Sequence, residues 1–488
     1  MNELSRMFAL PQQHLMPFLL VLWVGVAINI DLAPALTWHD GQRLAQLAFF
    51  LLVVVLLAVL PGLRRQSLLA WAGLPPAVRL ALGLAFGFGL CSALLATLPR
   101  WALLDWGMHG LWLVTAMAVA GQSRDPAAGL NSLLVMAFLA LATAYATSSF
   151  AVYLASLLVG PDYGVGFNVR ELYTGFSNLR FFGQVETMLL PFLLLPAMWW
   201  SRTRVRLALL WLVPAYWWML AVGSGTRGTW VALLVGVLAA ALFGGVAGRT
   251  WLRWQAGGLL AGLACYAVLI LGIPLLVDVP TTFMHRADDI LSLSRREDLW
   301  SASVMLALQY PVLGLGPMQF ALHATEVGAH PHNAVLQWAA EWGMPAALAF
   351  TLVFAYAGLR FAAGVRRNAG QAVTRDALVR VALLASLAGA AAQAMVDGVL
   401  VMPVSQMLLL LLCGWALGMQ QLMRAPPRID GLRGILAALF LSVAVWTTAS
   451  GVAPELGHIE ARQKAYLERF PEGHVLLPRF WAHGLLGQ

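Results

Sequence analysis

Long unbroken apolar runs recur along the chain, and they predict helices that cross a membrane. A membrane-spanning helix needs about 20 apolar residues, and thirteen runs of suitable length are present. They lie at about 15–30, 44–60, 80–98, 101–121, 130–158, 181–200, 207–222, 229–248, 256–277, 333–358, 381–401, 402–423 and 434–453. The runs do not alternate between apolar and polar residues, which favours helices over the strands of a membrane barrel. The pattern predicts an all-α integral membrane protein with about 13 transmembrane helices.

The composition supports the same class of protein. Of the 488 residues, 60% are hydrophobic and only 11% are charged, whereas a typical soluble domain is roughly 25% charged. These values exclude a secreted protein, a cytosolic enzyme and, despite the net charge of +8, a nucleic-acid binder. Cys91, Cys265 and Cys413 all lie inside apolar runs, so we expect neither a disulfide framework nor a metal cluster.

The arginines between the runs are distributed unevenly, which predicts the orientation of the chain. With the N-terminus inside, the inner segments hold 18 arginines and the short outer loops hold five. Loops rich in Arg and Lys normally stay in the cytoplasm. We therefore expect a cytoplasmic N-terminus and, because the number of spans is odd, a tail on the outer side. Two outer segments are long: a loop at about 278–332 and the tail at 454–488.

Costly polar residues gather at the predicted outer face. They are Arg180, Gln184, Glu186, Arg227, Arg286, Arg295, Arg296, His332 and Asp397. Polar groups in membrane helices are expensive and usually functional, although a single arginine at a helix end also serves as an interfacial anchor. Because these charges come from at least four separate segments, we expect a reaction site at this face.

The stretch around His330 and His332 is the most informative part of this face. Pro331 suits the first turn of a helix, which places His332 at the positive end of that helix, where an anion is favoured. Asn333, Gln337 and Glu341 recur at every fourth position and form a polar stripe on the helix. Asn333 also suits a plain N-cap, and the stripe also suits hydrogen bonding between helices. No carboxylate or Cys partner has the spacing of a zinc ligand, so no metal is expected.

These residue types suggest one kind of chemistry. A neutral imidazole takes a proton from an attacking hydroxyl near pH 7. Arginines hold a pyrophosphate by bidentate contacts and stabilise it as it leaves. The combination suits attack by an acceptor hydroxyl on a sugar that is linked to a lipid pyrophosphate.

Four motifs resemble the bacterial O-antigen ligase superfamily, which includes O-antigen polymerases and the O-oligosaccharyltransferases that modify pilins. The first is His332-Asn333, followed after nine residues by Gly343; Ala346 stands where the family usually has a second glycine. The others are Ser224-Gly225-Thr226-Arg227-Gly228, then Arg296-Glu297-Asp298-Leu299-Trp300 with Pro311-Val312-Leu313-Gly314-Leu315-Gly316, and the stretch 175–184. Together they cover about residues 175–400.

The resemblance implies a membrane glycosyltransferase of the GT-C type that takes a glycan from undecaprenyl pyrophosphate at the periplasmic face of the bacterial inner membrane, with no cofactor and no metal. It makes His332 the catalytic residue and assigns donor binding to Arg180, Arg227 and Arg296. Supporting polar roles are expected for Gln184, His330, Asn333, Gln337 and Asp397. We expect a polytopic membrane domain at 1–453, containing the ligase-like core at about 175–400 and the periplasmic loop at about 278–332, and a periplasmic tail at 454–488.

The tail favours a protein acceptor over a lipid. The stretch 478–484 resembles the end of pilin-type O-oligosaccharyltransferases, and Phe480, Trp481 and His483 are candidates for contact with a pilin. The alternatives are a tail that lies along the membrane without an acceptor role, an O-antigen ligase acting on lipid A-core, and an O-antigen polymerase. A transporter of lipid-linked sugars is a different class, and it is expected to place its polar groups near mid-membrane.

Overall fold

The computed structural model describes residues 14–124, 129–160, 165–200, 203–282, 296–323, 328–368, 370, 373–421, 431–469 and 477–486. Arg286 and Arg295 of the predicted outer loop lie outside the described residues, as do Arg6 and residues 470–476 of the tail.

Helices make up most of the described chain, and most of these helices are apolar. Eleven are long and apolar enough to cross a membrane. They are α3 (Trp38–Val59), α5 (Pro76–Leu95), α6 (Pro99–Gln122), α7 (Leu130–Leu158), α8 (Leu179–Leu193) continued by α9 (Leu195–Trp200), α10 (Arg204–Ser224), α12 (Gly245–Cys265) continued through η4 (Tyr266–Gly272) into α13 (Ile273–Leu276), α16 (Met344–Arg367), α17 (Arg375–Gln393), α18 (Pro403–Gln421) and α19 (Gly431–Val452). Two shorter apolar helices are α2 (Leu15–Asn29) and α11 (Arg227–Phe243). Each of the thirteen apolar runs therefore contains a helix, and the all-α membrane class is confirmed.

The remaining elements are short. They are α4 (Pro61–Ala72), β1 (Phe167–Asn168), η3 (Val169–Leu172), β2 (Thr281–Thr282), α14 (Arg296–Gln309), η6 (Gln319–His323), α15 (Ala334–Trp342) and α20 (Ile459–Arg469). The two strands pair in parallel, with Phe167 opposite Thr281.

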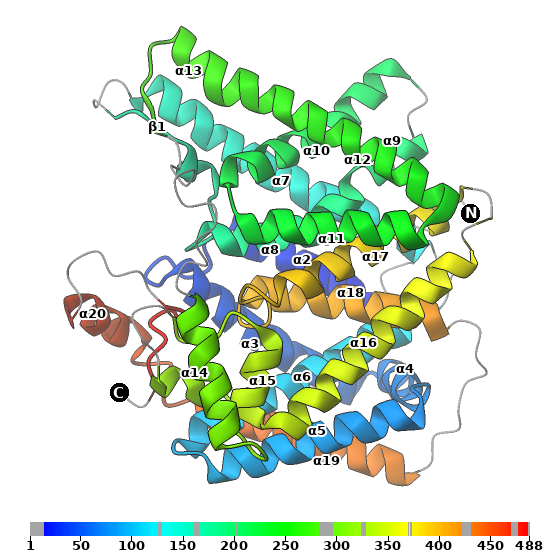
Figure 1. Cartoon of the computed structure of the whole chain (residues 1–488), viewed down its shortest axis with the longest axis vertical. Coiled ribbons are helices and arrows are strands. Elements are labelled where there is room, and N and C mark those ends of the chain that lie inside the picture. The colour runs from blue at the N-terminus through cyan, green and yellow to red at the C-terminus, as the bar shows by residue number, and fades with distance from the viewer. Residues whose placement is uncertain are drawn as a thin grey trace.

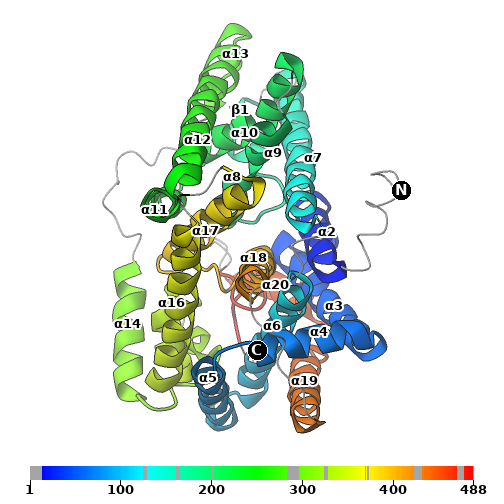
Figure 2. The same cartoon turned by 90° about the vertical axis from the view of Figure 1, so that its right-hand side faces the viewer.

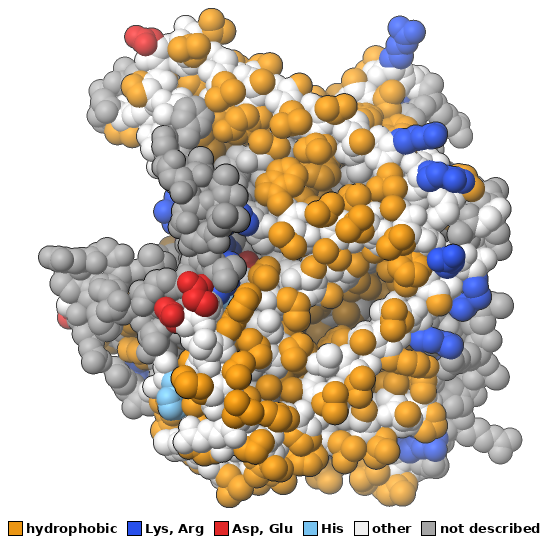
Figure 3. Space-filling view, in the orientation of Figure 1, with side chains coloured by type: hydrophobic (Ala, Val, Ile, Leu, Met, Phe, Trp, Pro, Cys, Tyr) orange, Lys and Arg blue, Asp and Glu red, His pale blue; other side chains and the backbone are white. Residues whose placement is uncertain are grey.

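The spanning helices lie side by side, and α18 occupies the middle of the bundle, where it packs against α2, α3, α6, α8 and α17 (Figures 1 and 2). Figure 3 shows apolar side chains over the broad middle of the surface and basic side chains gathered along one side. In the same orientation, α14, α15 and α20 lie toward the opposite side (Figure 1). An apolar band between two polar ends is the surface expected of a chain that spans a bilayer.

The predicted single helix at 333–358 is wrong, because the structure divides it at Gly343. Gly343 has a positive φ of 87°, and a Cβ there would lie 2.2 Å from the Val312 carbonyl oxygen. The next amide, of Met344, donates to the Pro311 carbonyl at 2.9 Å. The chain that follows α14 therefore crosses close to this point, and only glycine fits. As a result, Gln337 and Glu341 belong to the short helix α15 and lie outside the long span.

The predicted helix at 381–401 also ends early, at Gln393. The carbonyl of Ala394 accepts from the Ala334 amide at 2.9 Å, and the carbonyl of Met395 accepts from the side chain of Asn333 at 3.1 Å. The start of α15 thus satisfies carbonyls at the end of α17. Asp397 consequently lies in a turn between α17 and α18, and is not part of a helix.

Candidate active site

His332 lies in the loop before α15, in an uncommon backbone conformation. Its φ is +54°, a region that L-residues seldom adopt outside functional or strained sites. Asn333 is the N-cap of α15, because its Oδ1 accepts from the amide of Leu336 at 3.0 Å. Its Nδ2 donates to Met395. Asn333 therefore ties the loop at 328–333, which we call the histidine loop, to the turn that carries Asp397.

Asp397 faces His332 across these two loops. Its Oδ1 lies 3.7 Å from Nδ1 of His332, and the two side chains are only 4% and 13% exposed. The same Oδ1 accepts from the Gly398 amide at 2.8 Å. Asp397 is one of the five supporting residues expected from the sequence, and its carboxylate is the charged group that lies beside the candidate base.

The surroundings keep the His332 imidazole neutral. Burial lowers its pKa below the ordinary 6.5; the nearby Asp397 carboxylate raises it in part, and the positive charges of Arg180 and Arg296 lower it further. Burial alone would raise the pKa of Asp397, but His332, the Gly398 amide and Arg180 together hold it below its ordinary value. The neutral imidazole is the form that accepts a proton in general-base catalysis.

The three arginines predicted to bind the donor all lie in the first turn of a helix. Arg180 is in α8, Arg227 begins α11 and Arg296 begins α14. The charges of Arg180 and Arg296 act on His332. We call the end of the bundle that carries His332, Asp397 and these three helix starts the histidine face.

Close packing brings Arg227 to the same face. A Cβ at Gly183 in α8 would lie 2.1 Å from Oγ1 of Thr229 in α11, so the first turns of the two helices touch. A Cβ at Gly228 would lie 3.7 Å from the side chain of Val396, the neighbour of Asp397. All three arginines are half-buried, and helix N-termini add a partial positive charge to theirs. The arrangement suits a polyanion.

The other expected residues have structural contacts. Gln184 is fully buried, and its Oε1 accepts from Ser405 of α18. With its amide oxygen turned toward Arg479, Gln337 accepts from both terminal nitrogens of that arginine at 3.0 and 2.8 Å. His330 is 2% exposed, and its ring centroid lies 4.1 Å from that of His332. These contacts place Gln184 and Gln337 in the packing around the site and His330 directly behind His332.

Sequence reasoning missed the place of the tail aromatics. Phe480, Trp481 and His483 are 4%, 2% and 3% exposed. The expectation that they meet a pilin at the surface is therefore wrong, because the bundle already covers them. One feature of the sequence could have indicated this burial. His39, Asp40 and Arg43 stand at the start of an apolar run, and polar side chains buried there require hydrogen-bond partners.

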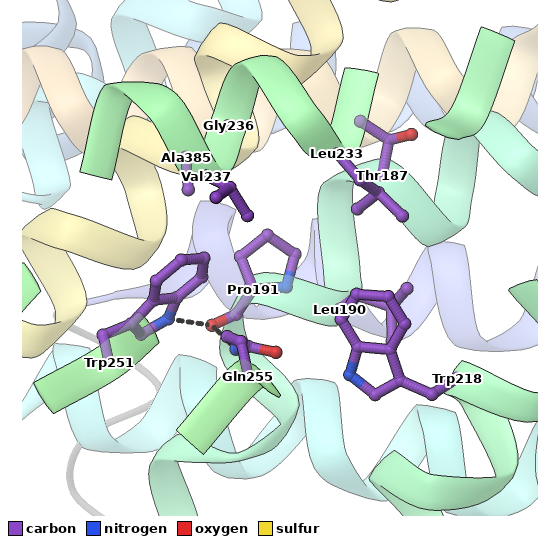
Figure 4. Close-up of a pocket in the computed structure, with 10 residues that line it drawn as sticks. All are labelled: Thr187, Leu190, Pro191, Trp218, Leu233, Gly236, Val237, Trp251, Gln255 and Ala385. Carbon is purple, nitrogen blue, oxygen red and sulfur yellow. Dashed lines mark hydrogen bonds between the residues drawn. The ribbon is translucent and has the colours of Figure 1, made fainter. Parts of the chain in front are cut away.

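A separate cavity lies among α8, α10, α11, α12 and α17 (Figure 4). Its lining includes Trp251 and Gln255, whose side chains donate to the Pro191 carbonyl at 2.9 and 3.3 Å. No residue of the histidine loop lines it. The cavity lies beside the second half of α8, which contributes Thr187, Leu190 and Pro191 to its lining. Within the described ranges, no group of three or more His, Cys, Asp or Glu side chains is arranged to hold a metal ion.

Comparison with known families supports the resemblance noted in the sequence. Residues 212–351 match the O-antigen ligase family. The matched segment includes Arg227, Arg296 and His332, and so covers two of the three arginines of the histidine face and its candidate base. The match supports a membrane glycosyltransferase of the O-antigen ligase or polymerase type. No curated protein matches the chain.

Proposed function

We propose that this O-antigen ligase-like chain moves a glycan from undecaprenyl pyrophosphate to an acceptor hydroxyl. The observation that carries the proposal is the His332–Asp397 pair, 3.7 Å apart, on the same face as three arginines from three different helix starts. A base and a polyanion site are the two parts that this reaction needs.

Each group then has a defined role. His332 accepts the proton of the acceptor hydroxyl on Nε2, while Asp397, facing Nδ1, stabilises the imidazolium that forms. The acceptor oxygen bonds to the anomeric carbon of the glycan as the bond from that carbon to the pyrophosphate oxygen breaks. Arg180, Arg227 and Arg296 hold the pyrophosphate as its negative charge increases. Neither a cofactor nor a metal takes part in any of these steps.

The orientation belongs to the same proposal. The arginine-rich side of Figure 3 faces the cytoplasm, and the histidine face lies in the periplasm at the bacterial inner membrane. The N-terminus is then cytoplasmic and the tail periplasmic. The proposal includes the GT-C assignment. It also divides the chain into a membrane domain at 1–453 and a tail at 454–488; the membrane domain contains the core at about 175–400 and the loop at about 278–332.

We propose a pilin-type protein as the acceptor. The aromatic residues of the tail no longer support this choice, but α20 does, because its surface is polar and exposed: Glu460, Lys464 and Glu468 all face outward. Figure 1 places α20 at the edge of the molecule on the side of α14 and α15. A folded acceptor can reach such a helix from the periplasm, whereas lipid A-core would approach within the bilayer.

The test is a transfer assay with the purified full chain in membrane nanodiscs. Undecaprenyl-pyrophosphate glycan is incubated with pilin or, separately, with lipid A-core, and product mass is measured. We expect glycosylated pilin from the active protein and none from His332→Ala. Transfer to lipid A-core alone would replace the protein acceptor with a lipid acceptor, and lengthened donor chains without either product would indicate a polymerase. Donor movement across the membrane without any transfer would refute the enzyme and favour the transporter.

A further inference from the structure

Most of the segment 477–486 is buried against the histidine face, although it is far from that face in sequence. Arg479, Phe480, Trp481, Ala482 and His483 are each less than 5% exposed. Gly484 closes a tight turn: its φ is +68°, and a Cβ there would lie 2.0 Å from the Leu477 carbonyl oxygen and 3.0 Å from the Cβ of Ala329. The turn thus packs directly on the loop that carries His330 and His332.

One contact of this segment reaches the ring of His330. Nδ1 of His330 lies 3.2 Å from the carbonyl oxygen of Pro478, a hydrogen bond that defines which nitrogen carries the proton. On another side of the ring, a Cβ at Gly398 would lie 2.5 Å from Nε2. The ring is therefore confined between residue 478, the backbone beside Asp397, and the ring of His332.

A second set of contacts reaches α15, the helix that begins immediately after His332. Arg479 donates to Oε2 of Glu341 at 2.6 Å, and both terminal nitrogens of Arg479 face the amide oxygen of Gln337. Arg479 is 4% exposed and Glu341 is fully buried. Such a charge-assisted pair in the interior holds its partners in one geometry.

The segment is itself attached to α3. The Phe480 carbonyl oxygen lies 3.0 Å from Nε2 of His39 and 3.2 Å from Nε of Arg43, which donates to it. Asp40 accepts from the Ala482 amide at 2.7 Å. These bonds connect α3 to both ends of the histidine loop through a single stretch of chain.

We propose that Arg479 is a positioning residue, which with the Pro478 carbonyl holds His330 and α15 so that His332 faces Asp397. This inference rests on the proposed role of His332 as the base. It predicts that loss of the Arg479 contacts misplaces the base while leaving the pyrophosphate site, on α8, α11 and α14, intact.

The test compares Arg479→Gln with Arg100→Gln in the full chain. Arg100, near the start of α6, is a matched control, because it also pairs with a buried carboxylate, that of Glu455, and its described contacts are with Glu455, Gly451 and Trp101 rather than with the histidine loop. We expect Arg479→Gln to lower kcat for glycan transfer by roughly 10²-fold, the cost of about 1 Å of misplacement, with little change in KM for the undecaprenyl-pyrophosphate glycan. Arg479→Lys should restore part of kcat, since it keeps the charge but not the fork that reaches Glu341 and Gln337 together. Arg100→Gln should change neither constant.

A second measurement does not depend on turnover. Diethyl pyrocarbonate modifies exposed neutral imidazoles, and mass spectrometry gives the labelling rate of His330 and His332. Arg479→Gln should speed the labelling of His330 several-fold, whereas Arg100→Gln should not. If the single variant fails to fold, Arg479→Gln with Glu341→Gln removes both charges and is measured in its place.

The outcomes separate the two proposals. An inactive His332→Ala together with wild-type kcat and labelling in Arg479→Gln would overturn the positioning role and leave the proposed base in place. Active His332→Ala would overturn the proposed function itself, whatever the labelling of His330 shows.

Discussion

Oδ1 of Asp397 lies 3.7 Å from Nδ1 of His332, and the two residues come from separate loops that Asn333 connects. This relationship leaves Nε2 of the imidazole for the acceptor hydroxyl. The end of α17 at Gln393 also matters for the site. If α17 continued past Gln393, the Asp397 carboxylate would move away from His332.

His332→Ala removes the proposed base. We expect turnover to fall by about 10²–10⁴-fold, the usual contribution of a general base, while binding of the donor is retained. Single-turnover transfer and donor binding to the same preparation measure the two effects. His330→Ala is the matched comparison and should be milder; a larger loss there would mean that the adjacent imidazole is the base.

Asp397→Asn keeps the size of the side chain and removes its charge. The imidazolium that forms during transfer then loses its counter-ion, and a loss of one pKa unit of stabilisation corresponds to about tenfold in rate. We expect kcat to fall by at least about that factor with an unchanged melting temperature. Wild-type kcat in Asp397→Asn would show that the 3.7 Å approach has no part in the reaction.

The pH dependence of transfer follows from the lowered pKa of His332. Burial and the nearby arginines move this pKa below 6.5, so the basic form of the imidazole persists to lower pH. The acid limb of the kcat/KM profile, which reports groups of the free enzyme, should therefore have its midpoint below pH 6.5. Asp397→Asn removes an influence that raises the pKa, and should shift the limb still lower. An acid limb centred above pH 6.5 would contradict the assignment of this group as the base.

Arg180→Lys and Arg227→Lys test the pyrophosphate site. Lysine keeps the charge but lacks the planar fork that contacts two phosphate oxygens together. Each change should raise KM for the undecaprenyl-pyrophosphate glycan, lower kcat, or both, beyond any change in expression. Arg249→Lys, on the arginine-rich side, is the control and should have no effect. Equal activity of both site variants would mean that these arginines are interfacial anchors.

The orientation of the chain is tested by reporter fusions after Arg428 and after His458. The helix α19, Gly431–Val452, lies between these positions, so the two fusions should report opposite sides of the membrane. A phosphatase reporter active in the periplasm and a fluorescent reporter active in the cytoplasm give complementary signals. Both fusions on the cytoplasmic side would remove the thirteenth span and the periplasmic tail.

Sequence patterns predicted the spanning helices well because long apolar runs have one stable form in lipid. They failed at Gly343, where the break depends on the close approach of Val312, a contact that no local pattern encodes. Asp397 was named as a polar residue of the outer face, but its turn depends on bonds from the start of α15.

The same reason explains the misplaced tail. Phe480 and Trp481 read as a surface patch because a short polar tail is normally exposed. Their burial depends on His39, Asp40 and Arg43, hundreds of residues earlier in the chain. Arg479 and Glu341 likewise meet only in three dimensions. Local pattern therefore singled out the residues that we propose as the base and the donor-binding arginines, whereas long-range pairing determined what packs around them.

The bonds between residues 477–486 and the histidine loop have a consequence for how the protein is made. The ribosome must pass residue 486, and α19 must be inserted, before Arg479 can reach Glu341. Until then, a nascent chain holds the arginines that we propose to bind the donor, but not the contacts that we propose to position the base. The two proposals together therefore imply that biosynthesis separates capture of the lipid carrier from the onset of transfer, and that a chain whose translation stops early is inactive in the membrane.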